Sequence, residues 1–504
     1  MDFLQILDLP LAPGGLVEWT PKLPGPSSLH ADPRPTSHNH ERHLCEAVAY
    51  QRETGHTGGR ESWLGVAIEF DEPLSIPAIR SALTAWIDRH EVLRSHVLIS
   101  GDLEHPQLRR YTADPGSVSL KMSRIGWYHD PTLLVEQIAG WFDRSTAPVR
   151  WPAYCFATVG REHSFTLLFA GDHSLLDGYS LIMLVSQLRA HYHAAVVELG
   201  RTTRTAATPL IPAATVGSYI DFSATERDEA DGSDASHPAV DAWASFLAEG
   251  MPRYPTLPLD DPAAHPARAH EQVHGFAVGG YEEGSEAAAE AQPQQSLYAL
   301  LADDTTTNEF TAVCAEAGTT LFAGVMAALA FASYERTGST RFRAVLPRHT
   351  RHEPQWQTAL GWFVSLSPFE LDLTGVTTFA QLSIRASAEL RRGRIAASLP
   401  LLRVAQIVHA VDSPQFVISF LDSRGAPGAA ADDAGAARVL RSHRYADDEV
   451  YLWVNRTPAG LRLSARYPAD LDADVRGFAS AISDLIADVA ARSSWHDRGF
   501  ALDR

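Results

Sequence analysis

The sequence predicts an α/β protein of two lobes, each an open sheet flanked by helices. Its 504 residues exceed what one hydrophobic core normally organises. Apolar runs typical of strands alternate with amphipathic helical segments on both sides of residues 201–236. That stretch has no periodicity and is rich in Thr, Pro, Gly, Ser and acidic residues, as a boundary region often is. We therefore expect lobes at residues 1–206 and 207–504, each with a sheet covered by helices.

In the first half, an irregular lead-in over residues 21–39 precedes a mixed series of helices and strands. Ile79, Leu83, Trp86 and Ile87 recur at helical spacing, so they define the apolar face of one predicted helix. Strands are expected at 63–70, 96–99 and 164–171, and further helices at 41–52, 133–144 and 180–199.

The second half repeats this mixture. Helices are expected at 239–249, 305–317, 320–337 and 474–491, and strands at 343–346, 363–371, 415–420, 450–455 and 461–467. Residues 424–437 consist mostly of Gly, Ala, Pro and Asp, which predicts a loop.

Composition and charge exclude several classes of protein. Hydrophobic residues make up 45% and charged residues 20%, so the chain is not wholly disordered. Acidic residues outnumber basic ones by 61 to 42, and the net charge of −19 argues against nucleic acid or an anionic membrane as a partner. No apolar run reaches the ~20 residues of a bilayer span, and the first residues lack the cationic start of a signal peptide. We expect a cytoplasmic monomer without an integral membrane segment.

The cysteines and the first histidines of the chain do not predict a metal site. Cys45, Cys155 and Cys314 lie far apart, so we expect three buried apolar side chains and neither a disulfide framework nor a structural zinc site. His38, His40 and His43 lie close together but lack the HExxH spacing of a zinc enzyme.

The sharpest local signal is HSLLDG at residues 173–178, between an apolar strand and a helix. A histidine in a loop at a strand end can be neutral at pH 7 and accept a proton from a hydroxyl, as a general base must. Gly178 permits a backbone turn that other residues resist. The alternative is a surface loop whose aspartate caps the next helix, and the spacing alone leaves both open.

Three segments together resemble the motifs of the condensation-domain superfamily of CoA- and carrier-protein-dependent acyltransferases. They are DRHEVLR at 88–94, DHSLLDG at 172–178 and GWFVSLSP at 361–368, in the family's order. The resemblance implies two chloramphenicol-acetyltransferase-like lobes, mixed open sheets flanked by helices, with an active-site channel between them. Residues 8–21, 360–371, 415–427 and 450–456 look most like the polyketide-associated protein (Pap) acyltransferases of actinobacteria.

The resemblance also implies roles for individual residues. His173 matches the catalytic histidine and Gly178 the glycine of the motif. Asp177 matches a structural aspartate that pairs with an arginine in the family, and Arg94 is the partner that we expect. Asp172 stands where the family has its first histidine, which weakens the motif without removing the base. Three interpretations stay open: Asp172 orients the His173 imidazole, tunes its pKa, or marks an activity that has drifted.

Candidate substrate-binding residues are less specific. Trp362, Ser365 and Ser419 fall in segments that line the channel in the family, although Trp362 equally fits a core position. Arg348 belongs, with Arg341, Arg343 and Arg351, to one of two arginine clusters that can meet CoA phosphates or an acidic carrier protein. A solvated helix end is the alternative for both clusters, and the second consists of Arg385, Arg391, Arg392 and Arg394.

The implied function is transfer of an acyl group from an acyl thioester to a hydroxyl of a sugar or polyol such as trehalose, in lipid or secondary-metabolite biosynthesis. The donor is acyl-CoA or an acyl group on carrier-protein phosphopantetheine, and no other cofactor is expected. Direct transfer with His173 as general base is favoured because no G-x-S-x-G elbow occurs. An acyl carrier protein or polyketide synthase is a candidate partner. The alternatives are an amide-forming condensation enzyme with an amine acceptor and a non-catalytic binding module.

Overall fold

The computed structural model describes residues 1–55, 62–103, 105–200, 216–248, 254–258, 294–409, 413–443 and 449–492. The chain forms two compact units. The first contains Met1–Gly232, His349–Val364 and Gly425–Tyr445, and the second contains Ser233–Arg348, Ser365–Arg424 and Ala446–Arg504. The boundary expected at residues 206 and 207 lies outside the described residues. Two segments from the second half of the chain belong to the first unit, and the site described below depends on one of them.

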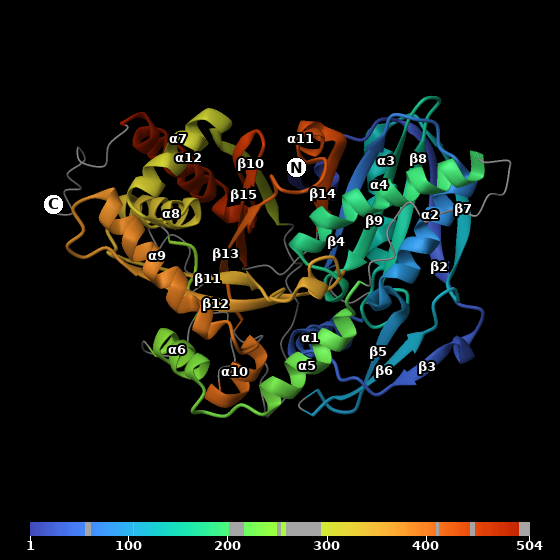
Figure 1. Ribbon diagram of the computed structural model, residues 1–504, viewed down its shortest axis with the longest axis horizontal. Helices are drawn as coiled ribbons and strands as arrows, with labels where there is room; N and C mark the ends of the chain where they lie inside the picture. The colour runs from blue at the N-terminus through green and yellow to red at the C-terminus, as the bar shows by residue number, and fades with distance from the viewer. Residues whose placement is uncertain are drawn as a thin grey trace. The chain divides into compact units, whose positions relative to one another are not determined.

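The first unit is built on a seven-stranded sheet with the order β1-β14-β4-β9-β8-β2-β7 (Figure 1). Its strands are β1 (Asp2–Gln5), β2 (Gly14–Lys22), β4 (Trp63–Phe70), β7 (Ser119–Tyr128), β8 (Tyr154–Gly160), β9 (Phe165–Asp172) and β14 (Ala437–Arg441). β1 and β14 pair in parallel and the other neighbours pair antiparallel, so the sheet is mixed. A smaller antiparallel sheet contains β3 (Leu29–Asp32), β6 (Gln107–Ala113) and β5 (Ser95–Ser100).

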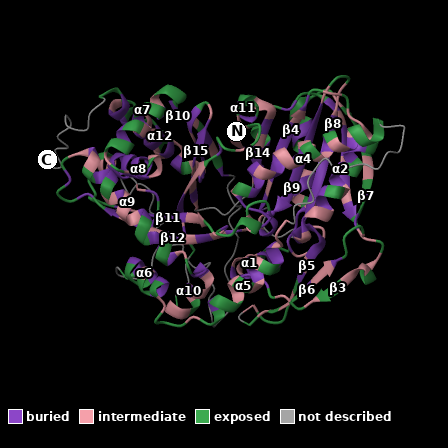
Figure 2. Cartoon of the chain, in the orientation of Figure 1, coloured by how far each residue is buried: buried purple, intermediate pink, exposed green. Residues whose placement is uncertain are grey.

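Helices cover both faces of the central strand β9. The helices of the unit are α1 (His38–Thr54), α2 (Ile76–Arg89), α3 (Pro131–Ser145), α4 (Gly178–Gly200) and α5 (Tyr219–Asp231). Phe165, Leu167 and Phe169 pack in one core with side chains of α2 and α4, whereas Leu168 and Ala170 pack in a second core with α3. Alternate strand residues point to opposite faces, so every residue of β9 is buried (Figure 2).

The second unit has a six-stranded mixed sheet with the order β10-β16-β15-β13-β11-β12. Its strands are β10 (Gln295–Asp303), β11 (Arg341–His349), β12 (Val364–Asp372), β13 (Phe416–Asp422), β15 (Val450–Thr457) and β16 (Gly460–Tyr467). Its helices are α6 (Pro238–Leu247), α7 (Asp304–Glu316), α8 (Leu321–Thr337), α9 (Phe379–Ala396), α10 (Leu401–Val408) and α12 (Asp472–Ala491). One core joins α7, α8, α9 and α12 to this sheet. Two lobes of mixed sheet flanked by helices confirm the predicted fold class.

Several local predictions need correction. The stretch expected to be irregular up to residue 236 contains α5, which begins where the Ser218 side chain accepts hydrogen bonds from two backbone N–H groups. The helix expected from residue 41 begins at His38, because Ser37 caps it by accepting from the His40 N–H. The expected loop at 424–437 includes the short helix α11 (Ala429–Ala431) and leads directly into β14. Tertiary pairing of β14 with β1 and β4 decides that strand, and no local periodicity indicates it.

Among the described residues, no single helix combines the length and apolar composition needed to cross a bilayer. α7 and α8 meet these criteria only when they are taken together, and they are bent by 98° at the break between them. The cytoplasmic location stays a prediction.

Candidate active site

His173 follows the last residue of β9 and begins a short 3-10 turn, His173–Leu175, before α4. The Asp172 carboxylate accepts a hydrogen bond of 2.9 Å from the Ser174 N–H and so caps this turn. Leu176 is fully buried and fixes the turn in the core. The sequence therefore turns the chain out of the sheet at the residue that precedes the imidazole.

The His173 ring is half-buried and contacts the indole of Trp362, with 4.4 Å between the ring centroids. Its Nδ1 is buried, and no described residue forms a hydrogen bond with it. Burial lowers the pKa of His173 to about 4, and the nearby His43 acts in the same direction. The imidazole is therefore neutral at pH 7, the protonation state that a general base requires.

Asp177 forms a buried ion pair with Arg351, although we expected Arg94 as its partner. Arg351 Nη2 lies 3.1 Å from Asp177 Oδ1 and 3.2 Å from Oδ2, and both side chains are almost fully buried. Asp177 also accepts hydrogen bonds from the backbone N–H of Ser180 (2.7 Å) and of Phe363 (3.0 Å). One carboxylate thus joins the first turn of α4 to the segment His349–Val364, which carries Trp362.

Arg351 binds several further groups of the same segment. Its Nη1 donates to the backbone carbonyls of Trp356 (2.7 Å) and Ala359 (2.6 Å), and its Nη2 donates to Ser180 Oγ (2.8 Å). The guanidinium also lies over the ring of Phe363, 4.1 Å from its centroid. The expectation of a structural aspartate paired with arginine is met, but by an arginine 174 residues away in sequence. Sequence spacing alone does not single out that arginine.

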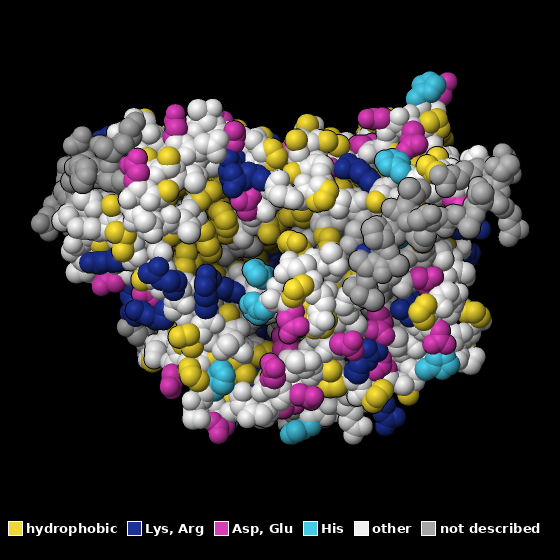
Figure 3. All heavy atoms as spheres, in the orientation of Figure 1, with side chains coloured by type: hydrophobic (Ala, Val, Ile, Leu, Met, Phe, Trp, Pro, Cys, Tyr) yellow, Lys and Arg dark blue, Asp and Glu magenta, His cyan; other side chains and the backbone are white. Residues whose placement is uncertain are grey.

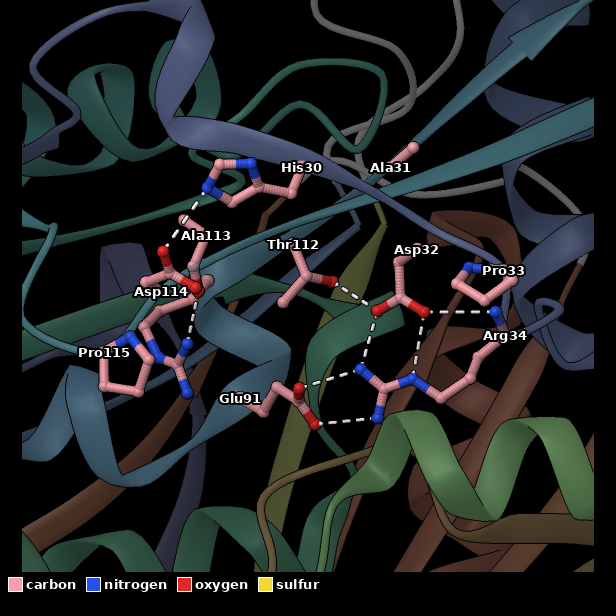
Figure 4. A pocket seen from close by; sticks show the side chains of 11 residues that line it. His30, Ala31, Asp32, Pro33, Arg34, Glu91, Thr112, Ala113, Asp114 and Pro115 are labelled. Atoms are coloured by element: carbon pink, nitrogen blue, oxygen red, sulfur yellow. Dashed lines mark hydrogen bonds and ion pairs between the residues drawn. The ribbon is translucent and has the colours of Figure 1, made fainter.

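Arg94 lies instead in the wall of a pocket of the first unit, of about 460 Å³. Figure 4 shows this pocket with Asp32, Arg34 and Glu91 labelled. The buried Arg94 side chain donates to the backbone carbonyl of Ala113. In the same pocket Arg34 donates to Asp32 (2.6 Å) and Glu91 (2.8 Å). Arg94 therefore belongs to the wall of this charged pocket and does not hold Asp177.

Asp172 has a partner that sequence reasoning missed. His43 Nε2, on α1, lies 2.9 Å and 3.0 Å from the two carboxylate oxygens of Asp172. Ser62 Oγ donates to Asp172 Oδ2 at 2.7 Å. Burial by itself would raise the pKa of Asp172, but the charge and hydrogen bond of His43 outweigh it and lower the pKa to about 2. A buried aspartate in place of a histidine demands such a donor, which is the signal that could have pointed to His43.

His43 also approaches Trp362 edge-on, with centroids 5.7 Å apart and ring planes at 85°. Trp362 therefore contacts the rings of both His43 and His173. The neighbouring histidines of α1 are used elsewhere: His38 Nε2 lies 3.0 Å from Asp231, and His40 is buried. The described part of the chain holds no group of three or more residues suited to a metal ion.

Gly178 is present at the start of α4, but not for the expected reason. Its φ lies outside the left-handed region, and a Cβ added there would have no atom within 4 Å. Neither the backbone nor local packing requires glycine at this position.

Ser365, Ser419 and Arg348 lie in the second unit, where each is described by its own contacts. The Ser365 hydroxyl is buried and donates to the Leu399 carbonyl at 3.5 Å. Ser419 is half-buried on β13. Arg348 donates to Ser367 Oγ (3.0 Å) and the Leu390 carbonyl (2.7 Å), and burial lowers its pKa to about 10.

The second arginine cluster lies on α9, and basic side chains gather on the surface of this part of the molecule (Figure 3). Arg385 donates to the backbone carbonyls of Asp372 and Thr374, and Arg392 pairs with Glu389 at 2.8 Å. Arg391 and Arg394 are exposed. The cluster is thus a solvated helix surface that includes positive charge available to an anion.

Comparison with known proteins places this geometry in a family. The chain is 27% identical to acyltransferase PapA3 of Mycobacterium tuberculosis over 359 aligned residues. The alignment covers 70% of this chain and 66% of PapA3, so the chain spans just under two thirds of that relative's length. It is 24% identical over 436 residues, 85% of this chain and 76% of the relative, to 2'-acyl-2-O-sulfo-trehalose (hydroxy)phthioceranyltransferase PapA1 of the same organism.

A solved structure of a PapA2 acyl transferase has the same fold. It superposes with a TM-score of 0.79 at 19% identity, covering 97% of this chain and 100% of the other. The family model described as the condensation domain matches residues 50–420. Because that match spans most of the sequence, the chain belongs to the condensation-domain family.

Proposed function

We propose that this protein is an acyltransferase that moves an acyl group from a thioester to a hydroxyl of a sugar or polyol, with trehalose the first candidate. The relatives named above are acyltransferases, and the name of PapA1 includes a sulfated trehalose. The observation that carries the proposal is the neutral His173, half-buried in a turn fixed on one side by Asp172 and on the other by the Asp177–Arg351 pair.

In the proposed reaction His173 acts through Nε2, because Nδ1 is buried. Nε2 takes the proton of the acceptor hydroxyl while the oxygen attacks the thioester carbonyl carbon. The tetrahedral intermediate collapses, its C–S bond breaks, and the imidazolium returns the proton to the departing thiolate. The products are one ester and one free thiol, and a general base of this kind contributes typically ~10²–10⁴-fold to the rate.

The surrounding residues have separate tasks in this proposal. Asp177 does not act on substrate, since its oxygens are occupied by Arg351, Ser180 and Phe363. It keeps α4 and the Trp362 segment together. Trp362 contacts the imidazole and presents an aromatic surface that suits the apolar face of a sugar ring. CoA and a carrier-protein phosphopantetheine are both proposed donors, and an acyl carrier protein remains a candidate partner.

The experiment uses the purified protein with acetyl-CoA or palmitoyl-CoA and trehalose, following free thiol and the ester by mass spectrometry. We expect ester and thiol in equal amounts, and a loss of about 10²–10⁴-fold in kcat for His173→Ala. His163→Ala is the matched control, because that side chain is 86% exposed in the loop before β9. Circular dichroism melts check that both variants fold.

Three outcomes would contradict the proposal. An unchanged rate in His173→Ala would remove the imidazole from its role. Acylation of amines in a parallel acceptor set, with hydroxyls unreacted, would establish an amide-forming enzyme. Thioester binding without transfer to any acceptor, tested with pantetheine thioesters as well as CoA thioesters, would establish a binding module.

A further inference from the structure

We infer that His43 and Asp172 form a positioning pair for His173, which holds the catalytic turn in place and balances the charge beside the imidazole. The inference rests on the proposed function only where it predicts an effect of the pair on the rate of acyl transfer. The family's motif does not supply this pair, because Asp172 replaces the first motif histidine and His43 comes from a separate helix.

The first argument is the hydrogen bonding of Asp172. The carboxylate is fully buried, and its oxygens receive His43 Nε2, the Ser62 hydroxyl and the Ser174 N–H. An ionised carboxylate only accepts hydrogen bonds, so the proton of this contact sits on His43 Nε2. The carboxylate therefore fixes the orientation of the His43 ring.

The second argument is mechanical. Asp172 is the last residue of β9 and caps the turn that begins with His173. The Trp362 ring that touches His173 is also touched by His43. His43 is thus connected to His173 by two routes, one through the backbone of Asp172 and one through the indole. Displacing His43 would loosen both supports at once.

The third argument is charge. The charged groups that face His173 are His43 from α1 together with Asp172 and Asp177, and Arg351 lies behind Asp177. After burial, which is the main cause, His43 lowers the pKa of His173 and the two aspartates raise it. Asp177 is already neutralised by Arg351, so Asp172 is the carboxylate whose effect depends on His43. Removing His43 would leave a negative charge beside the imidazole and favour its protonation.

The test measures the titration of His173 directly. Protein labelled with 13Cε1-histidine is titrated by NMR between pH 3.5 and 7.5, and His173→Gln identifies the resonance. In the wild type we expect the ring to stay neutral down to about pH 5. In His43→Gln the midpoint of the His173 titration should rise by about one pH unit. The double variant His43→Gln/Asp172→Asn, which removes both charges, should return it to the wild-type position.

A matched control is available on the same helix. His38→Gln removes another buried histidine that contacts an aspartate, Asp231, and should leave the His173 titration unchanged. In the acyl-transfer assay, His43→Gln should lower the ratio of kcat/KM at pH 5 to that at pH 7.5 by about twofold, a pH-dependent loss that simple loosening of the fold does not produce.

An unchanged midpoint in His43→Gln would overturn the inference. If that variant does not fold, His43→Lys replaces it: a cation beside Asp172 should keep His173 neutral at pH 5, and a midpoint near 6 would overturn the inference. The NMR measurement needs no substrate. If the midpoint moves as expected but the protein shows no transferase activity, the proposed function is wrong. The inference about His43 and Asp172 is then still supported.

Discussion

Two aspartates, Asp172 and Asp177, flank His173, and their partners differ. Both carboxylates are buried, and both cap a turn or helix of the same loop. Asp177 pairs with the guanidinium of Arg351, and a guanidinium is in general a permanently charged partner. Asp172 pairs with the imidazole of His43, which can lose or gain a proton.

The two aspartates therefore hold the loop that carries His173 in two different ways. The Asp177–Arg351 pair holds α4 to the Trp362 segment, and its role is structural because its polar atoms are occupied. Asp177 accepts from the N–H groups of Ser180 and Phe363, and Arg351 donates to two backbone carbonyls. The Asp172–His43 pair lies beside the imidazole and can change its charge. Three variants and a pH series of the wild type break or sharpen this comparison, and the variants are taken from the largest expected effect to the smallest.

Asp177→Asn should have the largest effect on stability. It leaves the buried Arg351 guanidinium without its carboxylate, and losing one member of a buried pair costs about 3–5 kcal/mol in the free energy of unfolding. Urea unfolding followed by circular dichroism measures this. Asp114→Asn, at a carboxylate whose side chain is 77% exposed, is the control. Equal stability of the two variants would show that the Arg351 pair does not hold the loop.

A pH series of the wild type tests the buried imidazoles of the first unit together, without a substitution. Burial lowers the pKa of five histidines of the first unit, to about 3 for His40 and His90 and to about 4 for His96, His173 and His191. The unfolded chain binds these protons near pH 6.5 and the folded chain does not. Their stabilisation is therefore fully present above pH 6.5 and is lost as the pH falls toward 4.

For each of these histidines the free energy of unfolding should fall by about 1.4 kcal/mol per pH unit in that window. Urea unfolding at pH 7.5, 6.5 and 5.5 measures the slope. The cost of Asp177→Asn should stay constant over the same range, because arginine does not titrate there. A wild type equally stable at pH 7.5 and 5.5 would contradict the burial of neutral imidazoles.

Asp172→Asn should cost less than Asp177→Asn, about 1–3 kcal/mol. The amide still accepts a hydrogen bond from Ser62 or the Ser174 N–H, and His43 can become neutral where Arg351 cannot. The same urea measurement compares the two variants directly. A larger loss of unfolding free energy for Asp172→Asn than for Asp177→Asn would show that the His43 pair, and not the Arg351 pair, is the main structural support of the loop.

Gly178→Ala should have the smallest effect, within about 0.5 kcal/mol. The position begins α4, its φ is not left-handed, and a Cβ there would meet no atom within 4 Å. Alanine also has the higher helix propensity. Thermal melts compare this variant with Gly361→Ala. The second variant should lose more stability, because a Cβ at Gly361 would lie 2.5 Å from the Tyr219 ring. A marked loss in Gly178→Ala would show that the turn needs glycine after all.

Much of the site could be predicted from the sequence because the strand, the turn and the helix that form it are adjacent along the chain. The strand before His173 is apolar over its whole length, and the following helix is marked by its own pattern, so the imidazole is placed in the turn between them. Partners drawn from distant segments could not be predicted. Arg94 and Arg351 are equally plausible cations for Asp177 by residue type, and only packing brings Arg351 to it.

By itself the sequence determined the two-lobed class and the turn that carries His173, since these follow from apolar periodicity and from the order of strand, turn and helix. Only the tertiary structure decided that His349–Val364 and β14 join the first unit, that Arg351 pairs with Asp177, and that His43 lies within hydrogen-bond distance of Asp172. The reason is physical: a buried charge requires a partner, but any cation that folding brings within reach satisfies it, wherever that cation lies along the chain.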